Sequence, residues 1–489
     1  MHKIFVMQIQ GLIGRENEVH ILEQVMQRED AQLVAVYGRR RVGKTFLVKR
    51  FFNESYDFSF VGSYKTSTSI QLELFRGTLE RYSGKKIGKL KTWYIAFNAL
   101  REYLQSLNKE RIVIFLDELP WMDQPKSNFL SAFSFFWNDW ACNVPGLKLV
   151  ACGSATTWML DKFVGDKGGF YGRNNRAIYL PPFTLHEVEQ FMKMRGFVWN
   201  RYKIVEAYMV FGGIPYYLDM LDYTIPLEAN IDSLFFRQGT QLRGEYLFLF
   251  RTLFNEAPLY HRVVECLADN EQGMTQAEIK EKLRLNDGGT LSTCLENLQK
   301  CDFIRMYAGY KKKERETLYQ LTDLFTLFHL NFVRRDNGQD EHYWTNLNDY
   351  SKENWEGHAF EMVCLHHIPE IKQRLGIFGV LTNAYSWTTK AREDKDGSKW
   401  KKAQIDLLLE RADGHINICE MKFSKNEYRI TESYDERLRE RMNTFVHHTG
   451  TKATLHSTFV TTYGLVRNEY SGNVQSQVTL EDLFCVVPR

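Results

Sequence analysis

Three short apolar runs stand out in the first third of the chain, and Lys148 interrupts the third of them. They cover residues 33–36, 112–116 and 147–152, and such a run is typical of a parallel strand that is buried on both faces. Ahead of the first run, Val19, Leu22 and Val25 recur with a helical period. The pattern predicts an α/β region with a parallel sheet.

The middle of the chain shows a different pattern, with three helical segments followed by two strand-like runs at residues 303–306 and 318–321. Thr275 and Glu278 have the spacing of a capping box at the start of the second helix. A basic turn of three lysines, residues 311–313, lies between the two runs. This order predicts a winged helix-turn-helix with a helical linker over residues 235–335.

The third helix of this module displays few side chains that read DNA. A recognition helix exposes Arg, Asn, Gln or Lys, whereas this one displays mainly Ser292, Thr293, Glu296 and Asn297, and Glu296 would repel phosphate. Packing within the chain is therefore the stronger interpretation of the module, and DNA binding is the weaker one.

The last part, residues 336–489, carries a helix, a hairpin and another helix, and charged residues lie on both hairpin strands. Glu420 and Lys422 share a face because side chains alternate along a strand. A two-residue turn would set Asp406 opposite Met421, whereas a three-residue loop would set it opposite Glu420. Gly414 stands where a type I turn with a G1 bulge requires it, so we predict the three-residue loop and expect Asp406, Glu420 and Lys422 to converge.

Composition limits the classes that need to be considered. The chain of 489 residues is too long for one core, and its net charge of +3 argues for neither nucleic acid nor membrane. The eight cysteines form no C-x-x-C pair, which favours reduced thiols over zinc ligands or disulfides. Neither a secretory leader nor an apolar stretch of about 20 residues is present, so a cytoplasmic protein without membrane contact is expected.

The segment after the first apolar run has the pattern of a phosphate-binding loop. Residues 38–45, Gly-Arg-Arg-Arg-Val-Gly-Lys-Thr, match G-x-x-x-x-G-K-[ST] between a strand and a helix. In this motif backbone N–H groups surround the β-phosphate, the lysine reaches the β/γ oxygens and the hydroxyl joins the Mg²⁺ shell. We expect ATP or GTP binding by Gly38, Arg39, Arg40, Arg41, Val42, Gly43, Lys44 and Thr45.

The second and third apolar runs end in side chains that suit nucleotide hydrolysis. Asp117 would hold Mg²⁺ through its water shell and Glu118 would polarise the attacking water. Ser154 would either sense the γ-phosphate or cap a helix. Arg173 and Arg176 offer guanidinium groups for the γ-phosphate, and which of them contacts it stays open.

These motifs together resemble the archaeal-type ATPases of the STAND/AAA+ branch of P-loop proteins, which also occur in bacteria. The resemblance rests on Gly14-Arg15-Glu16, the phosphate-binding loop, the strand ending at Asp117-Glu118, Tyr171-Gly172-Arg173, and Gly212-Gly213-Ile214-Pro215. It implies an ATPase core over residues 1–185 and a helical lid over 186–234, in which the Gly-Gly-Ile-Pro segment brings the lid against the nucleotide. That segment also imposes a helix break.

The strand spacing of Asp406, Glu420 and Lys422 resembles the PD-(D/E)XK nuclease superfamily, which often ends proteins of this ATPase family. The resemblance implies Mg²⁺ held by Asp406 and Glu420, with Lys422 stabilising phosphate charge and Glu361 added from the preceding helix. The alternatives are an exposed hairpin face with ordinary charge pairs and a nuclease fold that binds without cleaving.

The sequence therefore supports two functions of different classes. In the first, an ATPase controls a Mg²⁺-dependent C-terminal nuclease acting on DNA. In the second, the chain is a STAND-type switch or scaffold with a degenerate nuclease fold, slow turnover and nucleotide-dependent homo-oligomers.

Overall fold

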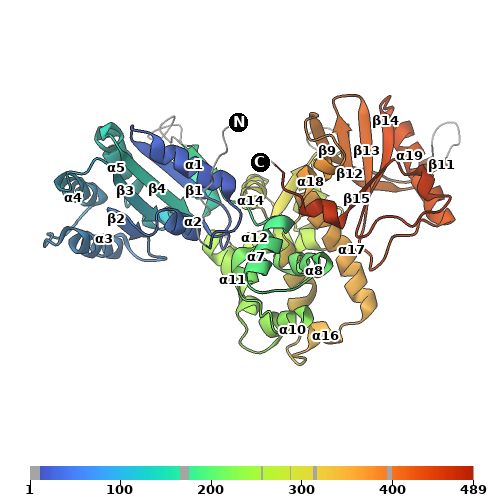
Figure 1. Cartoon of the computed structure of the whole chain (residues 1–489), viewed down its shortest axis with the longest axis horizontal. Helices are drawn as coiled ribbons and strands as arrows, with labels where there is room; N and C mark the ends of the chain where they lie inside the picture. The colour runs from blue at the N-terminus through green and yellow to red at the C-terminus, as the bar shows by residue number, and fades with distance from the viewer. Residues whose placement is uncertain are drawn as a thin grey trace. The chain divides into compact units, whose positions relative to one another are not determined.

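The computed structural model of the chain describes residues 11–165, 176–254, 257–286, 288–311, 317–393 and 399–487. The chain divides into two compact units, Met1–Pro182 and Phe183–Arg489. Each unit is built around sheets of its own (Figure 1). The first boundary lies close to the predicted end of the ATPase core at residue 185, whereas the boundaries predicted inside the second unit stay predictions.

The first unit contains the predicted parallel sheet, with strand order β2-β3-β4-β1-β5. Every pair of neighbouring strands is parallel, and β1, β3 and β4 coincide with the three apolar runs. The strands are β1 (Gln32–Tyr37), β2 (Phe58–Val61), β3 (Ile112–Asp117), β4 (Leu147–Gly153) and β5 (Arg176–Tyr179). The helices are α1 (Glu16–Gln27), α2 (Lys44–Phe51), α3 (Thr68–Ser83), α4 (Trp93–Ser106), α5 (Phe129–Asp139) and the short α6 (Thr156–Trp158).

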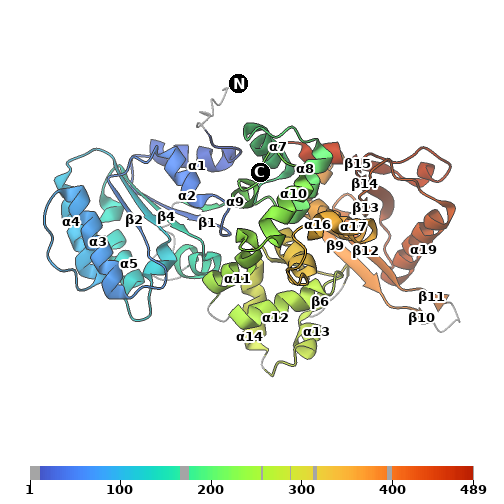
Figure 2. The same ribbon diagram turned by 90° about the horizontal axis from the view of Figure 1, so that it is seen from below.

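Aromatic side chains fill one face of this sheet. Helices α3, α4 and α5 lie together beside it, away from α1 (Figure 2), and their buried side chains join those of β1 to β4 in one cluster. Trp93 lies between Phe75 and Phe129, at ring-centroid distances of 5.6 and 4.9 Å. Large rings bury much apolar area for little side-chain entropy, so this face holds the sheet rigid behind the loops at its carboxyl edge.

The second unit begins with short helices: α7 (Leu185–Met194), α8 (Arg201–Phe211), α9 (Pro215–Leu218), α10 (Leu227–Ile231) and α11 (Gln241–Leu253). Gly212 and Gly213 end α8 with φ of 66° and 68°, and Pro215 begins α9. A Cβ on Gly213 would lie 2.4 Å from the Phe183 carbonyl oxygen. The Gly-Gly-Ile-Pro segment is therefore a helix break, as one of its two interpretations predicted.

The three helices and the hairpin expected in the middle of the chain are present. They are α12 (Ala257–Ala268), α13 (Gln276–Lys282), α14 (Gly289–Lys300), β7 (Ile304–Tyr307) and β8 (Leu318–Leu321), followed by α15 (Leu324–Phe328), and β6 (Met274–Thr275) completes a β6-β8-β7 sheet. The capping box of Thr275 and Glu278 is confirmed. Lys312 and Lys313 lie outside the described residues. The assignment as a winged helix stays a prediction.

The segment after β7 packs on the C-terminal part of the same unit. The Tyr310 N–H donates to the Ser386 carbonyl at 3.0 Å, and the Tyr310 ring belongs to a core cluster with Trp387 and Phe445. Lys311 Nζ donates to the Thr449 carbonyl at 3.0 Å. The hairpin therefore has a packing role within the chain.

The C-terminal sheet has the order β15-β14-β13-β12-β9. Its strands are β9 (Thr382–Thr389), β12 (Ala403–Arg411), β13 (His415–Lys422), β14 (Thr454–Thr461) and β15 (Ser476–Thr479), and β10 (Arg392–Glu393) pairs separately with β11 (Lys399–Trp400). The helices are α16 (Tyr343–Asn346), α17 (Asp349–His366), α18 (Ile368–Arg374) and α19 (Glu432–Thr449). Helix α17 packs against β13 and α19 against β12.

The turn between β12 and β13 is the predicted three-residue loop. Glu410 pairs with Ile416, Gly414 has a φ of 84°, and the Gly414 N–H donates to the Arg411 carbonyl at 3.2 Å. The antiparallel register pairs Leu407, which follows Asp406, with Cys419, which precedes Glu420. Among the described residues, no helix is long and apolar enough to cross a membrane.

Candidate functional site

The phosphate-binding loop connects the end of β1 to the start of α2. Gly38 and Gly43 have φ of 146° and 94°, values that favour glycine. A Cβ on Gly38 would lie 2.4 Å from the Leu180 carbonyl oxygen, because β5 runs beside β1. Glycine at position 38 thus lets the loop turn directly above the sheet.

Lys44 and Thr45 begin α2 beneath this loop. Lys44 is 7% exposed, and its Nζ donates to the Gly38 and Arg39 carbonyls at 3.0 and 2.9 Å. Burial lowers the pKa of the Lys44 ammonium. Thr45 Oγ1 donates to Asp117 Oδ2 at 2.9 Å, so a hydroxyl and a carboxylate from separate elements already lie together, as a shared Mg²⁺ shell requires.

Asp117 ends β3, Glu118 follows it, and the two side chains have different environments. Burial, and next the Glu118 charge, raise the pKa of Asp117. Glu118 has a left-handed backbone with a φ of 48°, which is uncommon for a residue other than glycine. Its Oε2 accepts hydrogen bonds from Ser154 Oγ at 2.8 Å and from the Ser154 N–H at 3.3 Å. Glu118 is thus held at the edge where β3 and β4 end side by side.

The structure gives Ser154 a contact that neither sequence interpretation contained. Ala155, and not Ser154, is the N-cap of α6, so the helix-cap alternative is wrong. The strand order places β4 next to β3, which brings Ser154 to Glu118. Strand order, which the sequence pattern alone did not supply, is the signal that would have found this pair.

The arginines of the loop have separate surroundings. Arg39 is buried at 2% exposure, and the Arg40 guanidinium lies 5.9 Å from the Trp121 ring centroid. Arg15, also buried, donates from Nη2 to the Val42 carbonyl at 3.4 Å, a bracing contact that the sequence motif did not reveal. Arg176 is the first residue of β5, and Arg173 lies outside the described residues.

Residues 12–221 match the family model described as an ATPase domain predominantly from Archaea. This part of the chain is an archaeal-type ATPase domain. The matched residues include the phosphate-binding loop, the Asp117-Glu118 pair and the Gly-Gly-Ile-Pro segment, as the resemblance in the sequence implied. The part that is predicted to be nuclease-like lies outside the match.

Known proteins are similar to the ATPase domain and its surroundings. An uncharacterised protein of Methanocaldococcus jannaschii is 26% identical over 328 residues, 66% of this chain and 68% of that protein. An uncharacterised ATP-binding protein of the same organism is 46% identical over 39 residues, 8% of this chain and 66% of that protein.

Among solved structures, the Walker-type ATPase of Pyrococcus abyssi has a TM-score of 0.48 at 18% identity, over 66% of this chain and 96% of that one. The ORC2 protein of Aeropyrum pernix, solved with ADPNP and ADP, has a TM-score of 0.42 at 12% identity, over 68% of this chain and 96% of that one.

In the second unit, Glu420 lies on β13 with both carboxylate oxygens engaged. Tyr434 OH donates to Oε2 at 2.8 Å, and the Arg441 guanidinium forms an ion pair with Oε1. Burial, and next the Glu420 charge, raise the pKa of the Tyr434 hydroxyl. Lys422 Nζ lies 5.7 Å from the Tyr434 ring centroid. The side chains that contact Glu420 and Lys422 here, Tyr434 and Arg441, both belong to α19.

Asp406 has other neighbours because β12 contains a bulge. The pairing of β12 with β9 shifts between Ile405 and Leu408, and both of these side chains pack in the cluster with Phe445 of α19. Because Ile405 and Leu408 share the face that packs on α19, the bulge places Asp406 and Leu407 on the other face of the sheet. There Gln404 Nε2 donates to Asp406 Oδ1 at 2.5 Å, and Asp406 and Arg305 of β7 both line a cavity of about 20 Å³.

Glu361 belongs to the surroundings of Asp406. It lies on α17, 3.8 Å from His358 Nδ1. Burial is the main cause that raises its pKa, the Asp406 charge raises it further, and Lys422 lowers it. The register led us to expect that Asp406, Glu420 and Lys422 converge. In the observed contacts Asp406 and Glu420 have different partners, and the bulge accounts for the difference.

The expected metal ligands therefore do not fit a shared Mg²⁺ ion in this arrangement. Within the described ranges, no three side chains of His, Cys, Asp or Glu lie close enough to hold a metal together. Each oxygen of Glu420 has a side-chain donor. The catalytic roles of Asp406, Glu420, Lys422 and Glu361 stay predictions.

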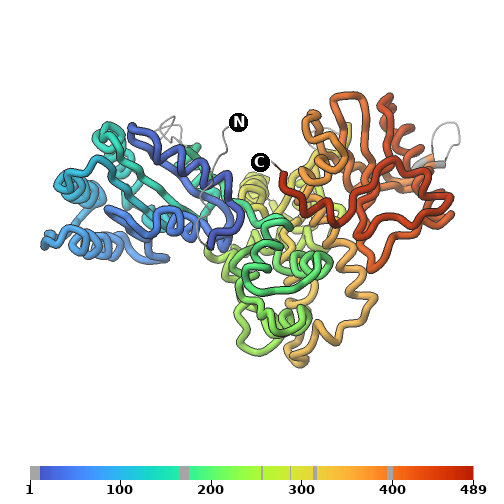
Figure 3. The backbone as a smooth tube through the Cα atoms, viewed as in Figure 1, coloured from blue at the N-terminus to red at the C-terminus, as the bar shows by residue number. Residues whose placement is uncertain are grey.

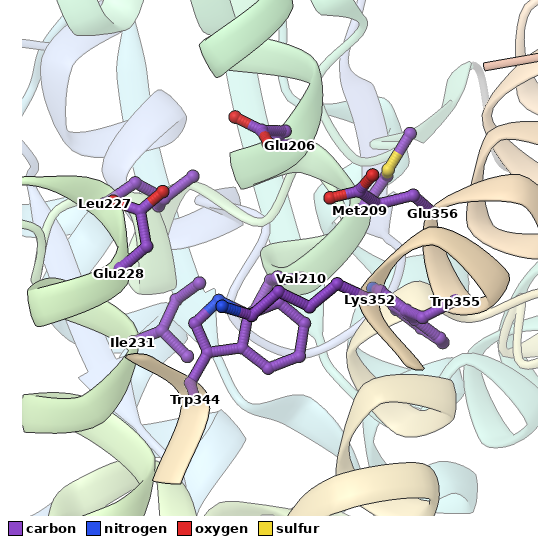
Figure 4. Close-up of a pocket in the computed structure, with 10 residues that line it drawn as sticks. All are labelled: Glu206, Met209, Val210, Leu227, Glu228, Ile231, Trp344, Lys352, Trp355 and Glu356. Atoms are coloured by element: carbon purple, nitrogen blue, oxygen red, sulfur yellow. The ribbon is translucent and has the colours of Figure 1, made fainter. Parts of the chain in front are cut away.

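Helices of the predicted lid and of the C-terminal part enclose a further pocket (Figure 4). Its volume is about 50 Å³, and its lining comes from α8, α10, α16 and α17. The carboxylates of Glu206, Glu228 and Glu356 and the Lys352 ammonium lie around two indole rings. Burial, followed by the Glu206 charge, raises the pKa of Glu356 to about 7. The two parts thus share a charged, partly buried boundary.

Proposed function

We propose that the first unit hydrolyses ATP with Mg²⁺ and that its nucleotide state controls the C-terminal nuclease-like domain and its action on DNA. The hydrogen bond between Thr45 and Asp117 carries the ATPase part, because it joins the two predicted Mg²⁺ ligands beside Lys44. The match of residues 12–221 to an ATPase domain supports it.

The residues of this unit would share the work of hydrolysis. Lys44 would exchange the Gly38 and Arg39 carbonyls for phosphate oxygens, and the backbone N–H groups of the loop would bind the β-phosphate. Thr45 and Asp117 would hold Mg²⁺, which supplies charge stabilisation to the phosphoryl oxygens. Glu118, held by the Ser154 hydrogen bonds, would orient the attacking water.

Lys44→Ala tests the ATPase part. We expect turnover of ATP to fall below detection and nucleotide affinity to drop, because a buried cation at the phosphates is lost. Lys49→Ala is the matched control, since Lys49 lies on the same helix with 47% of its side chain exposed. ATPase activity that survives Lys44→Ala would remove this proposal.

Contacts within the second unit support coupling from the lid to the C-terminal domain. Arg201 of α8 forms ion pairs with Glu189 and Glu481, and its guanidinium lies 4.7 Å from the Phe484 ring centroid. Tyr202 stacks on Phe423 at 4.7 Å. The last helical turn, η8 (Leu480–Phe484), runs beside the lid helices (Figure 3). A nucleotide-driven change in the lid would therefore reach the C-terminal sheet directly.

A second candidate is a STAND-type switch or scaffold whose nuclease fold does not cleave. The observation that favours it is the engagement of both Glu420 oxygens by Arg441 and Tyr434. Turnover would then be slow and indifferent to DNA, and the nucleotide would control a homo-oligomer.

DNA cleavage and DNA-stimulated ATP turnover separate the two candidates. The first predicts Mg²⁺-dependent cleavage that is lost in the Glu420→Ala, Lys422→Ala double variant. The second predicts no cleavage by the wild type and the same ATP turnover with and without DNA. Cleavage that persists in the double variant would sink the nuclease hypothesis.

A further inference from the structure

Glu420 is a buried carboxylate that must be neutralised by a neighbour. Its exposure is 6%, and a carboxylate removed from water is costly unless a charge and hydrogen bonds compensate it. In a metal-dependent nuclease the compensating charge is a divalent cation. Here the compensation comes from protein side chains.

Helix α19 supplies this compensation from one face. Tyr434 and Arg441 lie roughly two helical turns apart, and the stripe that they define includes the buried Leu438 and Phe445. The Arg441 guanidinium reaches Oε1 and the Tyr434 hydroxyl reaches Oε2. The packing of Phe445 against the sheet fixes this face, so the guanidinium is part of the buried interface and not a surface contact.

The other expected ligand, Asp406, has partners of its own. The β12 bulge between Ile405 and Leu408 leaves Asp406 beside Gln404, and Asp406 lines a small cavity together with Arg305. Each carboxylate thus has an arginine within its own surroundings. A hard cation such as Mg²⁺ requires several oxygen ligands that converge on one point.

We propose that the Arg441 guanidinium takes the place of a divalent cation at Glu420, so that an internal ion pair, and not a metal, joins β13 to α19. The inference rests on the second function proposed above and deepens it. The domain keeps the nuclease-like fold, and the carboxylate serves its stability.

Thermal unfolding of the nucleotide-free full chain, with and without Mn²⁺, tests this proposal. Arg441→Ala leaves Glu420 buried without its partner, and we expect the Tm of the second unit to fall by about 5 °C or more. Arg441→Lys keeps one charge and should recover part of the loss. Lys401→Ala is the matched control, because Lys401 pairs with Glu440 of the same helix while 79% of its own side chain and 45% of the Glu440 side chain are exposed, and its shift should stay within about 1 °C.

Adding Mn²⁺ tests whether Arg441 or a divalent cation neutralises the Glu420 carboxylate. We expect it to change the Tm of neither the wild type nor the Arg441→Ala variant, because Glu420 alone does not supply the several converging oxygen ligands that such a cation requires. Stabilisation of the wild type by Mn²⁺ that Glu420→Gln abolishes, or Mn²⁺-dependent DNA cleavage that Glu420→Gln abolishes, would overturn the proposal. The measurement of the wild-type Tm with and without Mn²⁺ does not itself depend on whether the variants fold. Because no nucleotide is used, failure here is distinct from failure of the Lys44→Ala test.

Discussion

The two units use carboxylates at strand ends in different ways. In the first unit Asp117 accepts a hydrogen bond from the Thr45 hydroxyl and lies near Lys44, so its partners are groups that a nucleotide and Mg²⁺ can rearrange. In the second unit Glu420 is bound by a guanidinium and a phenol of a packed helix. The comparison teaches that a carboxylate near a strand end can face either rearrangeable partners or a packed ion pair, and the different roles that we propose for Asp117 and Glu420 rest on this difference.

The sharpest way to break this comparison is to neutralise Glu118. We expect Glu118→Gln to lower ATP turnover by about a hundredfold or more, because the residue would no longer polarise the attacking water, while nucleotide binding is kept. Turnover measured at saturating ATP checks this outcome. Glu102→Gln, an exposed carboxylate of α4, should leave turnover unchanged. Near-normal turnover of the Glu118→Gln variant would show that another group acts on the water.

A smaller effect is expected at the residue that holds Glu118. Ser154→Ala removes the hydroxyl that donates to Glu118 at 2.8 Å. We expect kcat to fall about tenfold, the value of one hydrogen bond to a charged group, with little change in KM. Ser154→Thr keeps a hydroxyl and should restore most of the rate. An equal loss in the threonine variant would point to packing at β4 instead of the hydrogen bond.

The sequence revealed the parts of both sites that are local in the chain. Residues 38–45 are contiguous, so their loop and their place before α2 followed from the motif. The three-residue loop followed from Gly414 alone. The Glu118–Ser154 contact depends on β3 and β4 being neighbours, which a local pattern does not contain.

The β12 bulge escaped prediction for a related reason. Three successive leucines at residues 407–409 hide the alternation of faces on which the register argument relied. Arg441 was overlooked because its relation to Glu420 arises only when α19 packs on the sheet. Its spacing from Tyr434 was visible in the sequence, but nothing local indicated which strand this face would meet.

The smallest effect that we predict concerns the stability of the second unit. It arises at Glu356, a carboxylate that is not among the residues predicted to act in the nuclease. The pKa of Glu356 is raised from 4.5 to about 7, mainly by burial and next by the Glu206 charge. The Glu353 charge also raises this pKa, whereas the Lys425 and Lys203 charges lower it. Between these values the folded chain keeps a proton that the unfolded chain has released, so the free energy of unfolding falls as pH rises from about 4.5 to about 7. Glu356→Gln should abolish this fall.

Urea unfolding of the Glu356→Gln variant checks this prediction. The variant should match the wild type near pH 4 and exceed it by about 1 kcal/mol near pH 8, less than the full shift implies because the side chain is partly solvated. Glu353→Gln, at 62% side-chain exposure on the same helix, should show no such gain. ATP turnover should be unchanged in both variants. If Glu356→Gln altered turnover instead of stability, carboxylates of the second unit would take part in the ATPase cycle, and the division of roles between the two units would fail.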